Sequence, residues 1–243
     1  MIDPKLCAIW WAEARLPDPA LSALLSPAQR ERAGRFRRAM DRDRMIAAWA
    51  LARTLLGDLL GEDPADVAVE RHCGRCGSRE HGKPRLADAS AGVHFSLAHS
   101  GDHVVVAVSS AGPVGIDVEQ LRPTTDYRRL SRTTLTADEA AAFRAAGGRP
   151  LDFLRMWVRK EAVTKAVGTG VATPFDSFAV ASSAKPAALL TWPDDPPLVD
   201  RTTLLDLPGE STRPAAVAVL QRDVRITEHE GSHVLRAAAA RVA

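Results

Sequence analysis

The chain is poor in cysteine, in net charge and in long apolar runs, and each shortage excludes a class of protein. Three cysteines in 243 residues are too few for a disulfide framework. No apolar run has the length that crosses a bilayer, and residues 1–5 do not begin a secretory leader. A formal net charge of +2 does not call for nucleic acid. We expect a cytoplasmic protein that binds neither membranes nor nucleic acid.

The pattern of apolar residues predicts both strands and helices. Four short apolar runs predict strands, at residues 6–11, 104–108, 114–119 and 215–220. Residues 41–60 have apolar side chains at helical spacing and are followed by Gly61, which predicts a helix that ends there. Asp152 is expected to cap a second helix that runs to Val167. Helices set against small antiparallel sheets predict an α+β protein.

Two further signals concern boundaries. Ser26-Pro27-Ala28-Gln29 has the residues of a helix start with a capping box, and Thr136 with Glu139 has the same pattern. Glycine and proline gather in Ser109–Pro113, between two apolar runs. We expect this turn to divide the chain into subdomains of residues 1–110 and 111–243.

The strand predicted at 114–119 contains two carboxylates, Asp117 and Glu119. Their spacing places both side chains on one face, where they repel each other unless a cation or protons intervene. Glu161 and Lys165 lie one helical turn apart on the second predicted helix. Three carboxylates with a nearby lysine suit Mg²⁺ and a bound phosphate. The alternatives are a carboxylate pair that faces solvent and an ordinary surface ion pair.

A basic segment is the second candidate for chemistry. Seven arginines lie between Arg30 and Arg44, and Lys83, His99 and Ser100 add polar groups on other segments. Such groups, spread over several segments, suit a ligand with several phosphates. The alternative is a solvated helical face.

Cys73-x-x-Cys76, followed by His81, has the spacing of part of a structural zinc site. The sequence does not fix a fourth ligand, for which Cys7 and His94 are available. The alternative is a pair of free loop thiols. No G-x-S-x-G elbow, P-loop or G-x-G-x-x-G motif follows a predicted strand, so those chemistries lose support.

Six motifs occur in one order along nearly the whole chain: Ser26-Pro27 with basic followers, Gly82-Lys83-Pro84, Phe95-Ser96-x-x-His99-Ser100, Gly115-Ile116-Asp117-Val118-Glu119, Trp157-x-x-Lys160-Glu161-Ala162-x-x-Lys165 and Pro174-Phe175-Asp176-Ser177-Phe178. In this order the chain resembles the Sfp-type 4′-phosphopantetheinyl transferases. The fourth motif followed by the fifth is highly specific, whereas either alone would be weak.

The resemblance implies an enzyme that transfers 4′-phosphopantetheine from coenzyme A to a serine of an apo acyl or peptidyl carrier protein. The reaction would depend on Mg²⁺ and release adenosine 3′,5′-bisphosphate. The fold implied is two similar α/β subdomains related by a pseudo-twofold, with the active site in the cleft between them. A monomer is expected, because both halves lie in one chain. Members of this length favour a role in secondary metabolite biosynthesis.

The resemblance also implies roles for single residues. Asp117, Glu119 and Glu161 would hold Mg²⁺, Glu161 would also be the base for the carrier serine, and Lys165 would neutralise phosphate charge. Contacts with coenzyme A would come from Arg32, Arg44, Lys83, His99, Ser100 and Lys165. Gln29 and Ala98 depart from the family, where a basic residue and a serine are common. Cys73 and Cys76 lie outside the family pattern, so bound zinc would be structural.

Two alternatives from other classes remain at this stage. A metal-dependent nuclease could use Asp117 and Glu119, but Gln120 and Leu121 follow them where such sites usually have a lysine. A zinc-containing nucleic-acid-binding module leaves the carboxylates without a role, and it predicts binding that depends steeply on salt. If the chain is the transferase, the basic loop Arg122–Arg132 is where we expect a carrier protein to dock.

Overall fold

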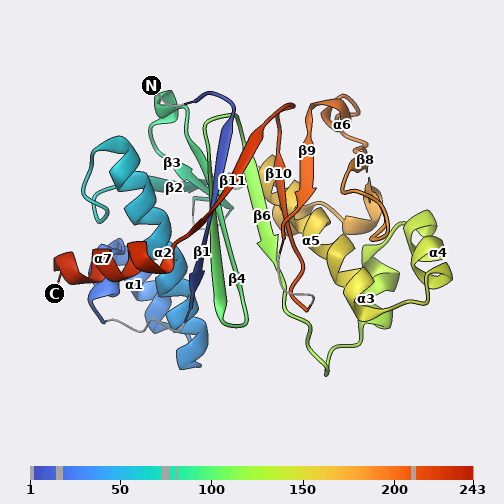
Figure 1. The fold of residues 1–243 in the computed structure, drawn as a ribbon, viewed down its shortest axis with the longest axis horizontal. Helices are drawn as coiled ribbons and strands as arrows, with labels where there is room; N and C mark the ends of the chain where they lie inside the picture. Colours follow the sequence, from blue (N-terminus) through green and yellow to red (C-terminus); the bar gives the residue numbers. More distant parts are fainter. Residues whose placement is uncertain (1–2, 15–18, 73–76, 80–81, 209–211, 243) are drawn as a thin grey trace.

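The computed structural model describes residues 3–14, 19–72, 77–79, 82–208 and 212–242. Its two main sheets lie against each other, and each is covered on its outer side by a long helix (Figure 1). The mixed α+β class is therefore confirmed. None of the helices in the described part of the chain is both long enough and apolar enough to cross a membrane.

The first sheet has the strand order β11-β1-β5-β4. Its strands are β1 (Leu6–Glu13), β4 (His94–Ser100), β5 (His103–Ser109) and β11 (Arg225–Glu230). β5 pairs antiparallel with both of its neighbours, whereas β11 runs parallel to β1. The helices beside this sheet are α1 (Pro27–Gly34), α2 (Ala39–Leu60) and α7 (Ser232–Val242), as Figure 1 shows. The end of the chain therefore returns to the sheet that its beginning forms.

The second sheet has the order β6-β10-β9. It consists of β6 (Val114–Val118), β9 (Thr203–Asp206) and β10 (Ala215–Val219), all antiparallel, with α5 (Pro150–Val167) packed against them. Every residue of β6 and β10 is buried. A strand buried along its whole length must be covered on both faces, and here α5 covers one face and the first sheet the other.

Three apolar clusters separate these layers. One lies between α2 and the first sheet, a second between the two sheets, and a third between the second sheet and α5. Alternation along β5 assigns Val104 and Val106 to the first cluster and Val105 and Ala107 to the second. The order of layers is thus helix, sheet, sheet, helix.

Smaller elements surround this frame. Two hairpins are formed by β2 (Val69–His72) with β3 (Lys83–Leu86) and by β7 (Ala179–Val180) with β8 (Leu189–Thr191). The other helices are α3 (Tyr127–Thr134), α4 (Ala137–Ala145) and α6 (Leu198–Arg201). Short 3₁₀ helices occur at Pro19–Leu24, Ala89–Ala91, Gly170–Ala172 and Phe175–Ser177.

Most predicted helix ends are confirmed, and one is wrong. Ser26 forms a full capping box with Gln29, and Thr136 forms one with Glu139. α2 ends at Gly61, which has a left-handed φ of 72°. The second long helix begins at Pro150 and not at Asp152, because proline's fixed φ suits the first helical position. Asp152 instead lies in the first turn and pairs with Arg149 at 2.7 Å.

Candidate active site

The closest approach between β6 and α5 occurs at Gly115. A Cβ atom at this position would lie 2.0 Å from the carbonyl oxygen of Ala162 and 2.4 Å from the amide nitrogen of Ala166. No side chain fits into such distances, so glycine is required for strand and helix to pack this closely. The packing sets the end of β6 that carries Asp117 against the helix that carries Lys165, and the two side chains meet at 2.7 Å.

Asp117 is 6% exposed and its two carboxylate oxygens differ in their surroundings. Oδ1 accepts a hydrogen bond from Lys165 Nζ at 2.7 Å, whereas no donor of the described residues reaches the buried Oδ2. Desolvation raises the pKa of Asp117, and Lys165 opposes this rise only in part. A buried carboxylate oxygen without a partner is costly, so this atom marks a position for a cation or a proton.

Glu119 follows β6 directly and is half-buried. Its Oε2 accepts a hydrogen bond from Ser100 Oγ at 2.9 Å. Desolvation and then the charge of Asp117 raise the pKa of Glu119, while Ser100 and Arg122 act in the opposite direction. The negative charge of Asp117 therefore disfavours the ionised form of Glu119.

Glu161, on α5, is the third carboxylate of the site. Desolvation raises the pKa of Glu161 to about 7, with further contributions from the charges of Asp117 and Glu119. Within the described residues no hydrogen bond holds its carboxylate, in contrast to those of Asp117 and Glu119. Near neutral pH this group exchanges a proton readily, and a bound cation would favour its charged form.

Lys165 lies among these three carboxylates. Its Nζ donates to Asp117 Oδ1 and also to the carbonyl oxygen of Ile116 at 3.1 Å. Desolvation alone would lower the pKa of Lys165, but Asp117, Glu161 and Glu119 together outweigh it and the net shift is upward. The side chain retains 28% of its exposure, and the ammonium, held charged by the carboxylates, has a third N–H beyond the two that bond to Asp117 and Ile116.

The donor set fits a hard divalent cation. In the parts of the chain that the structure describes, no three His, Cys, Asp or Glu side chains have the arrangement of a bound metal, and Lys165 instead neutralises Asp117. Oδ2 of Asp117 has no partner among the described residues, and burial raises the pKa of all three carboxyl groups, with the neighbouring carboxylates adding to the rise for Glu119 and Glu161. Carboxylate oxygens of this kind are the ligands that Mg²⁺ prefers.

Basic groups adjoin the carboxylates on the side of β4. Desolvation lowers the pKa of His99, and the charges of Lys165 and Arg44 lower it further, so these three groups lie near one another. Arg44, on α2, donates from Nε to the carbonyl oxygen of Gly101 and from Nη1 to Asp41 at 2.8 Å. The family resemblance implies that His99, Arg44 and Lys165 contact coenzyme A, and that role stays a prediction.

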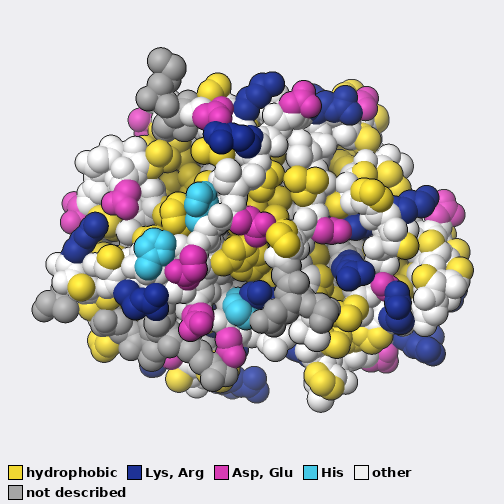
Figure 2. Space-filling model, viewed as in Figure 1, with side chains coloured by type: hydrophobic (Ala, Val, Ile, Leu, Met, Phe, Trp, Pro, Cys, Tyr) yellow, Lys and Arg dark blue, Asp and Glu magenta, His cyan; other side chains and the backbone are white. Residues whose placement is uncertain are grey.

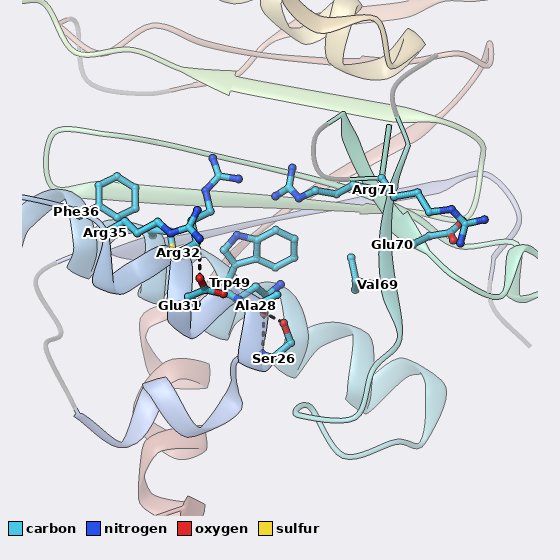
Figure 3. Close-up of a pocket in the computed structure, with 13 residues that line it drawn as sticks. Ser26, Ala28, Glu31, Arg32, Arg35, Phe36, Trp49, Val69, Glu70 and Arg71 are labelled. Carbon is cyan, nitrogen blue, oxygen red and sulfur yellow. Dashed lines mark hydrogen bonds and ion pairs between the residues drawn. The ribbon is translucent and has the colours of Figure 1, made fainter. Parts of the chain in front are cut away.

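A cavity of about 610 Å³ lies between α1, α2 and β2, and it is lined by Arg32, Arg35 and Arg71 around Trp49 (Figure 3). Arg35 pairs with Glu31 at 2.6 Å. Within the described residues no carboxylate pairs with Arg32 or Arg71, and Figure 3 shows them on opposite sides of Trp49.

Burial and then the charge of Arg32 lower the pKa of Arg71. The Arg71 guanidinium also lies 5.6 Å from the centre of the Trp49 ring. Two arginines of like charge beside an indole suit an anionic ligand with a flat ring. Sequence reasoning missed Arg71 and Trp49, because only the fold places β2 beside α2.

Two predicted contact residues are engaged within the protein. Lys83 Nζ donates to the carbonyl oxygens of Val114 and Ala166, both at 2.9 Å. Burial lowers the pKa of Lys83 to about 8. Ser100 is 3% exposed, and its hydroxyl donates to Glu119 and accepts from the amide of Gln120 at 3.0 Å.

The predicted zinc ligands Cys73, Cys76 and His81 lie outside the described residues. Cys7, a candidate for the fourth ligand, is fully buried in the apolar cluster between the two sheets. Burial raises the pKa of its thiol to about 12, which disfavours the thiolate that zinc requires.

Carboxylates, a charged lysine and an arginine-lined cavity point to an enzyme that acts on a phosphate compound, and comparison with known proteins identifies the class. The profile of the 4′-phosphopantetheinyl transferase superfamily matches residues 113–218, and that of the N-terminal part of 4′-phosphopantetheinyl transferase matches residues 14–111. The chain belongs to this superfamily.

Individual relatives carry the same description. The transferase HetI of Nostoc sp. is 33% identical over 211 residues, which cover 85% of this chain and 82% of HetI. The transferase psf-1 of Bacillus pumilus is 31% identical over 196 residues, 79% of either chain. Sfp of Bacillus subtilis is 29% identical over 167 residues, 65% of this chain and 66% of Sfp.

Proposed function

We propose that the protein transfers 4′-phosphopantetheine from coenzyme A to a serine hydroxyl of an apo acyl or peptidyl carrier protein and releases adenosine 3′,5′-bisphosphate. The site assignment rests on one observation. At the junction of β6 and α5, the side chains of Asp117, Glu119, Glu161 and Lys165 interact with one another. Membership of the superfamily supports the reaction. Location in the cytoplasm and a monomeric state stay predictions.

Asp117, Glu119 and Glu161 would hold Mg²⁺, which supplies Lewis-acid stabilisation of phosphate charge when it is bound. Lys165 would then neutralise a phosphate oxygen, because its ammonium is charged and has one N–H beyond those that bond to Asp117 and Ile116. Glu161 would take the proton of the carrier serine, directly or through water. Mg²⁺ at the same carboxylate would lower its pKa below the value of about 7 that burial gives it without the metal, so Glu161 would act as a weak base. Phosphoryl-type transfer needs positioning and charge stabilisation and no covalent help from the protein.

The arginine-lined cavity would hold the nucleotide end of coenzyme A. Arg32 and Arg71 provide two cationic groups that no carboxylate of the described residues neutralises, and the buried Trp49 forms part of the cavity wall between them (Figure 3). His99 and Arg44 would add positive or hydrogen-bonding groups beside the carboxylates, where the charges of Arg44 and Lys165 both act on His99. Phosphates and an aromatic base are what such a surface recognises.

We expect Arg71→Met to raise KM for coenzyme A about tenfold with little change in kcat, because a charge-assisted contact is worth roughly 1.5–3 kcal/mol. Arg85→Met is the matched control, since Arg85 pairs with Glu70 at 2.8 Å and does not line the cavity. Initial rates at varied coenzyme A measure both constants. An unchanged KM in Arg71→Met would place the nucleotide elsewhere.

The carrier protein would dock on α3 and α4. Arg128, Arg132 and Arg144 line a second cavity, of about 300 Å³, with Phe143. Figure 2 shows Lys and Arg side chains gathered over this part of the molecule. A basic surface with an apolar floor suits an acidic partner.

For Arg128→Glu with Arg129→Glu we predict a roughly tenfold rise in KM for the carrier, with KM for coenzyme A unchanged. Arg236→Glu with Arg241→Glu is the control, because α7 lies on the far side of the molecule from α3 (Figure 1). If the carrier's KM stays the same in the first double variant, docking does not involve this surface.

The two layers of sheet and helix support the proposal of two related subdomains. α2 packs on the first sheet and α5 on the second, with the turn Ser109–Pro113 between β5 and β6. In this proposal the subdomain of residues 1–110 would also include β11 and α7, because they lie with the first sheet. The carboxylates of β6 would then lie in the cleft between the halves.

Release of adenosine 3′,5′-bisphosphate, followed by chromatography, tests the proposed reaction. Protein, coenzyme A, Mg²⁺ and an apo carrier should release one nucleotide per carrier modified. Removal of Mg²⁺ with EDTA, or of the acceptor serine from the carrier, should stop the release. Release that continues without the carrier would show a hydrolase instead, and release in EDTA would remove the metal from the proposal.

A further inference from the structure

β6 is the edge strand of its sheet, yet all of its residues are buried. It pairs with β10 on one side, and on the other it meets the first sheet without a ladder of backbone hydrogen bonds. A buried strand edge leaves amide and carbonyl groups that must find partners elsewhere. In this protein the partners are polar side chains.

Three of these side chains, Lys83 on β3 and Ser96 and Ser100 on β4, come from neighbouring strands. Ser96 Oγ accepts a hydrogen bond from the amide of Ile116 at 3.2 Å. Lys83 Nζ donates to Val114 O, at the start of β6, and to Ala166 O, in the last turn of α5. The stem of Lys83 also lies 3.6 Å from the Cβ position of Gly168, the residue that ends α5. Lys83 thus joins the strand that carries Asp117 to the helix that carries Glu161.

Ser100 acts at the other end of the strand. Its hydroxyl has one proton, which it donates to Glu119 Oε2, and its oxygen accepts from the amide of Gln120. Glu119 and Gln120, which follow β6, therefore engage the hydroxyl's one proton and one of its two lone pairs. At 3% exposure Ser100 has no donor left for a phosphate of the substrate.

We infer that Ser100 and Lys83 are positioning residues for the carboxylate site and not contacts of coenzyme A. Ser100 sets the direction of the Glu119 carboxylate, and Lys83 holds the start of β6 against the end of α5. This inference rests on the proposed function, since it assigns the two residues to the geometry of that same site. The family resemblance implies that Ser100 and Lys83 contact coenzyme A, and the inference assigns them this positioning role instead.

Ser100→Ala tests the inference through metal affinity. We expect Mn²⁺ binding, measured by electron paramagnetic resonance with coenzyme A present and no carrier, to weaken about tenfold, because groups that orient a metal ligand have effects of this size. KM for coenzyme A should stay unchanged, and Ser100→Thr should restore Mn²⁺ affinity because it retains the hydroxyl. Ser90→Ala is the control, since its hydroxyl is exposed and donates to Asp88, which is not one of the three carboxylates of the site.

Lys83→Met gives an independent readout. We expect lower kcat and a lower Tm with KM for coenzyme A unchanged, and partial recovery of kcat in Lys83→Arg. A raised KM for coenzyme A in Ser100→Ala or Lys83→Met, with Mn²⁺ affinity and kcat as in the wild type, would overturn the inference. These outcomes are distinct from failure of the proposed function, in which the wild-type protein itself transfers nothing.

Discussion

Glu161→Gln is expected to lower kcat/KM for carrier modification by roughly a thousandfold while the protein stays folded. The substitution keeps the size and shape of the side chain but removes its negative charge and its ability to accept a proton. Glu161 sits against Asp117, Glu119 and Lys165, and its pKa near 7 is set by desolvation and by the two other carboxylates. Loss of this group therefore removes a metal ligand and the proposed base together.

Circular dichroism and Tm show whether the Glu161→Gln protein is folded, and we expect Tm to be equal or higher because one of three mutually repelling carboxylates is gone. Glu62→Gln is the matched control, at an exposed position just after α2. Transfer at the wild-type rate by a folded Glu161→Gln protein would exclude Glu161 both as ligand and as base.

Gly115→Ala has the second largest expected effect. The new methyl group would lie 2.0 Å from Ala162 O and 2.8 Å from Lys165 Cβ, so β6 and α5 must move apart. Overpacking of this kind costs about 1–3 kcal/mol, which corresponds to a fall in Tm of roughly 5 °C. Displacement of Asp117 from Glu161 by about 1 Å should also lower kcat about a hundredfold.

Gly34→Ala is the control for Gly115→Ala. Gly34 is the last residue of α1, and no atom lies within 4 Å of the position that its Cβ would take. Gly34→Ala should leave Tm unchanged or raise it slightly, because alanine has a higher helix propensity than glycine. Equal Tm and kcat in Gly115→Ala and the wild type would show that the close packing of β6 on α5 is not needed for the site.

Local features of the fold could be predicted from sequence because neighbouring residues determine them. The capping boxes at Ser26 and Thr136 and the stop at Gly61 depend on three or four adjacent side chains. The strand with Asp117 and the helix with Glu161 followed from apolar spacing in the same way. Their meeting did not follow from spacing, and only the family resemblance indicated it.

Long-range pairings could not be predicted from local patterns. β11 pairs with β1, so residues near the two ends of the chain lie side by side. Ile226 is the one apolar residue of Arg225–Glu230, and the strand is mostly exposed, so it lacks the apolar pattern by which a strand is recognised. β9 and α7 were missed as well, although β9 contains two leucines and α7 is alanine-rich with buried Leu235. The sequence pattern offered no signal that β11 joins the first sheet.

Polar residues inside the fold were misjudged as well. Lys160 interrupts the apolar face of α5 in the sequence, yet its side chain is fully buried. It pairs with Glu139 at 2.8 Å, lies 4.4 Å from the centre of the Phe178 ring and donates to the carbonyl oxygen of Phe175 at 2.7 Å. A buried lysine is stable only where such partners converge, and sequence does not show convergence. The partners of Lys83 and Ser100 inside the protein were likewise not visible in the sequence.

The mass of an apo carrier protein after incubation with this protein, coenzyme A and Mg²⁺ tests the central claim most directly. We predict a gain of one phosphopantetheine group on the acceptor serine, seen in the intact mass and located by fragmentation, and no gain with Glu161→Gln. An unchanged mass for acyl and peptidyl carriers alike, with folded protein and intact coenzyme A, would contradict the account.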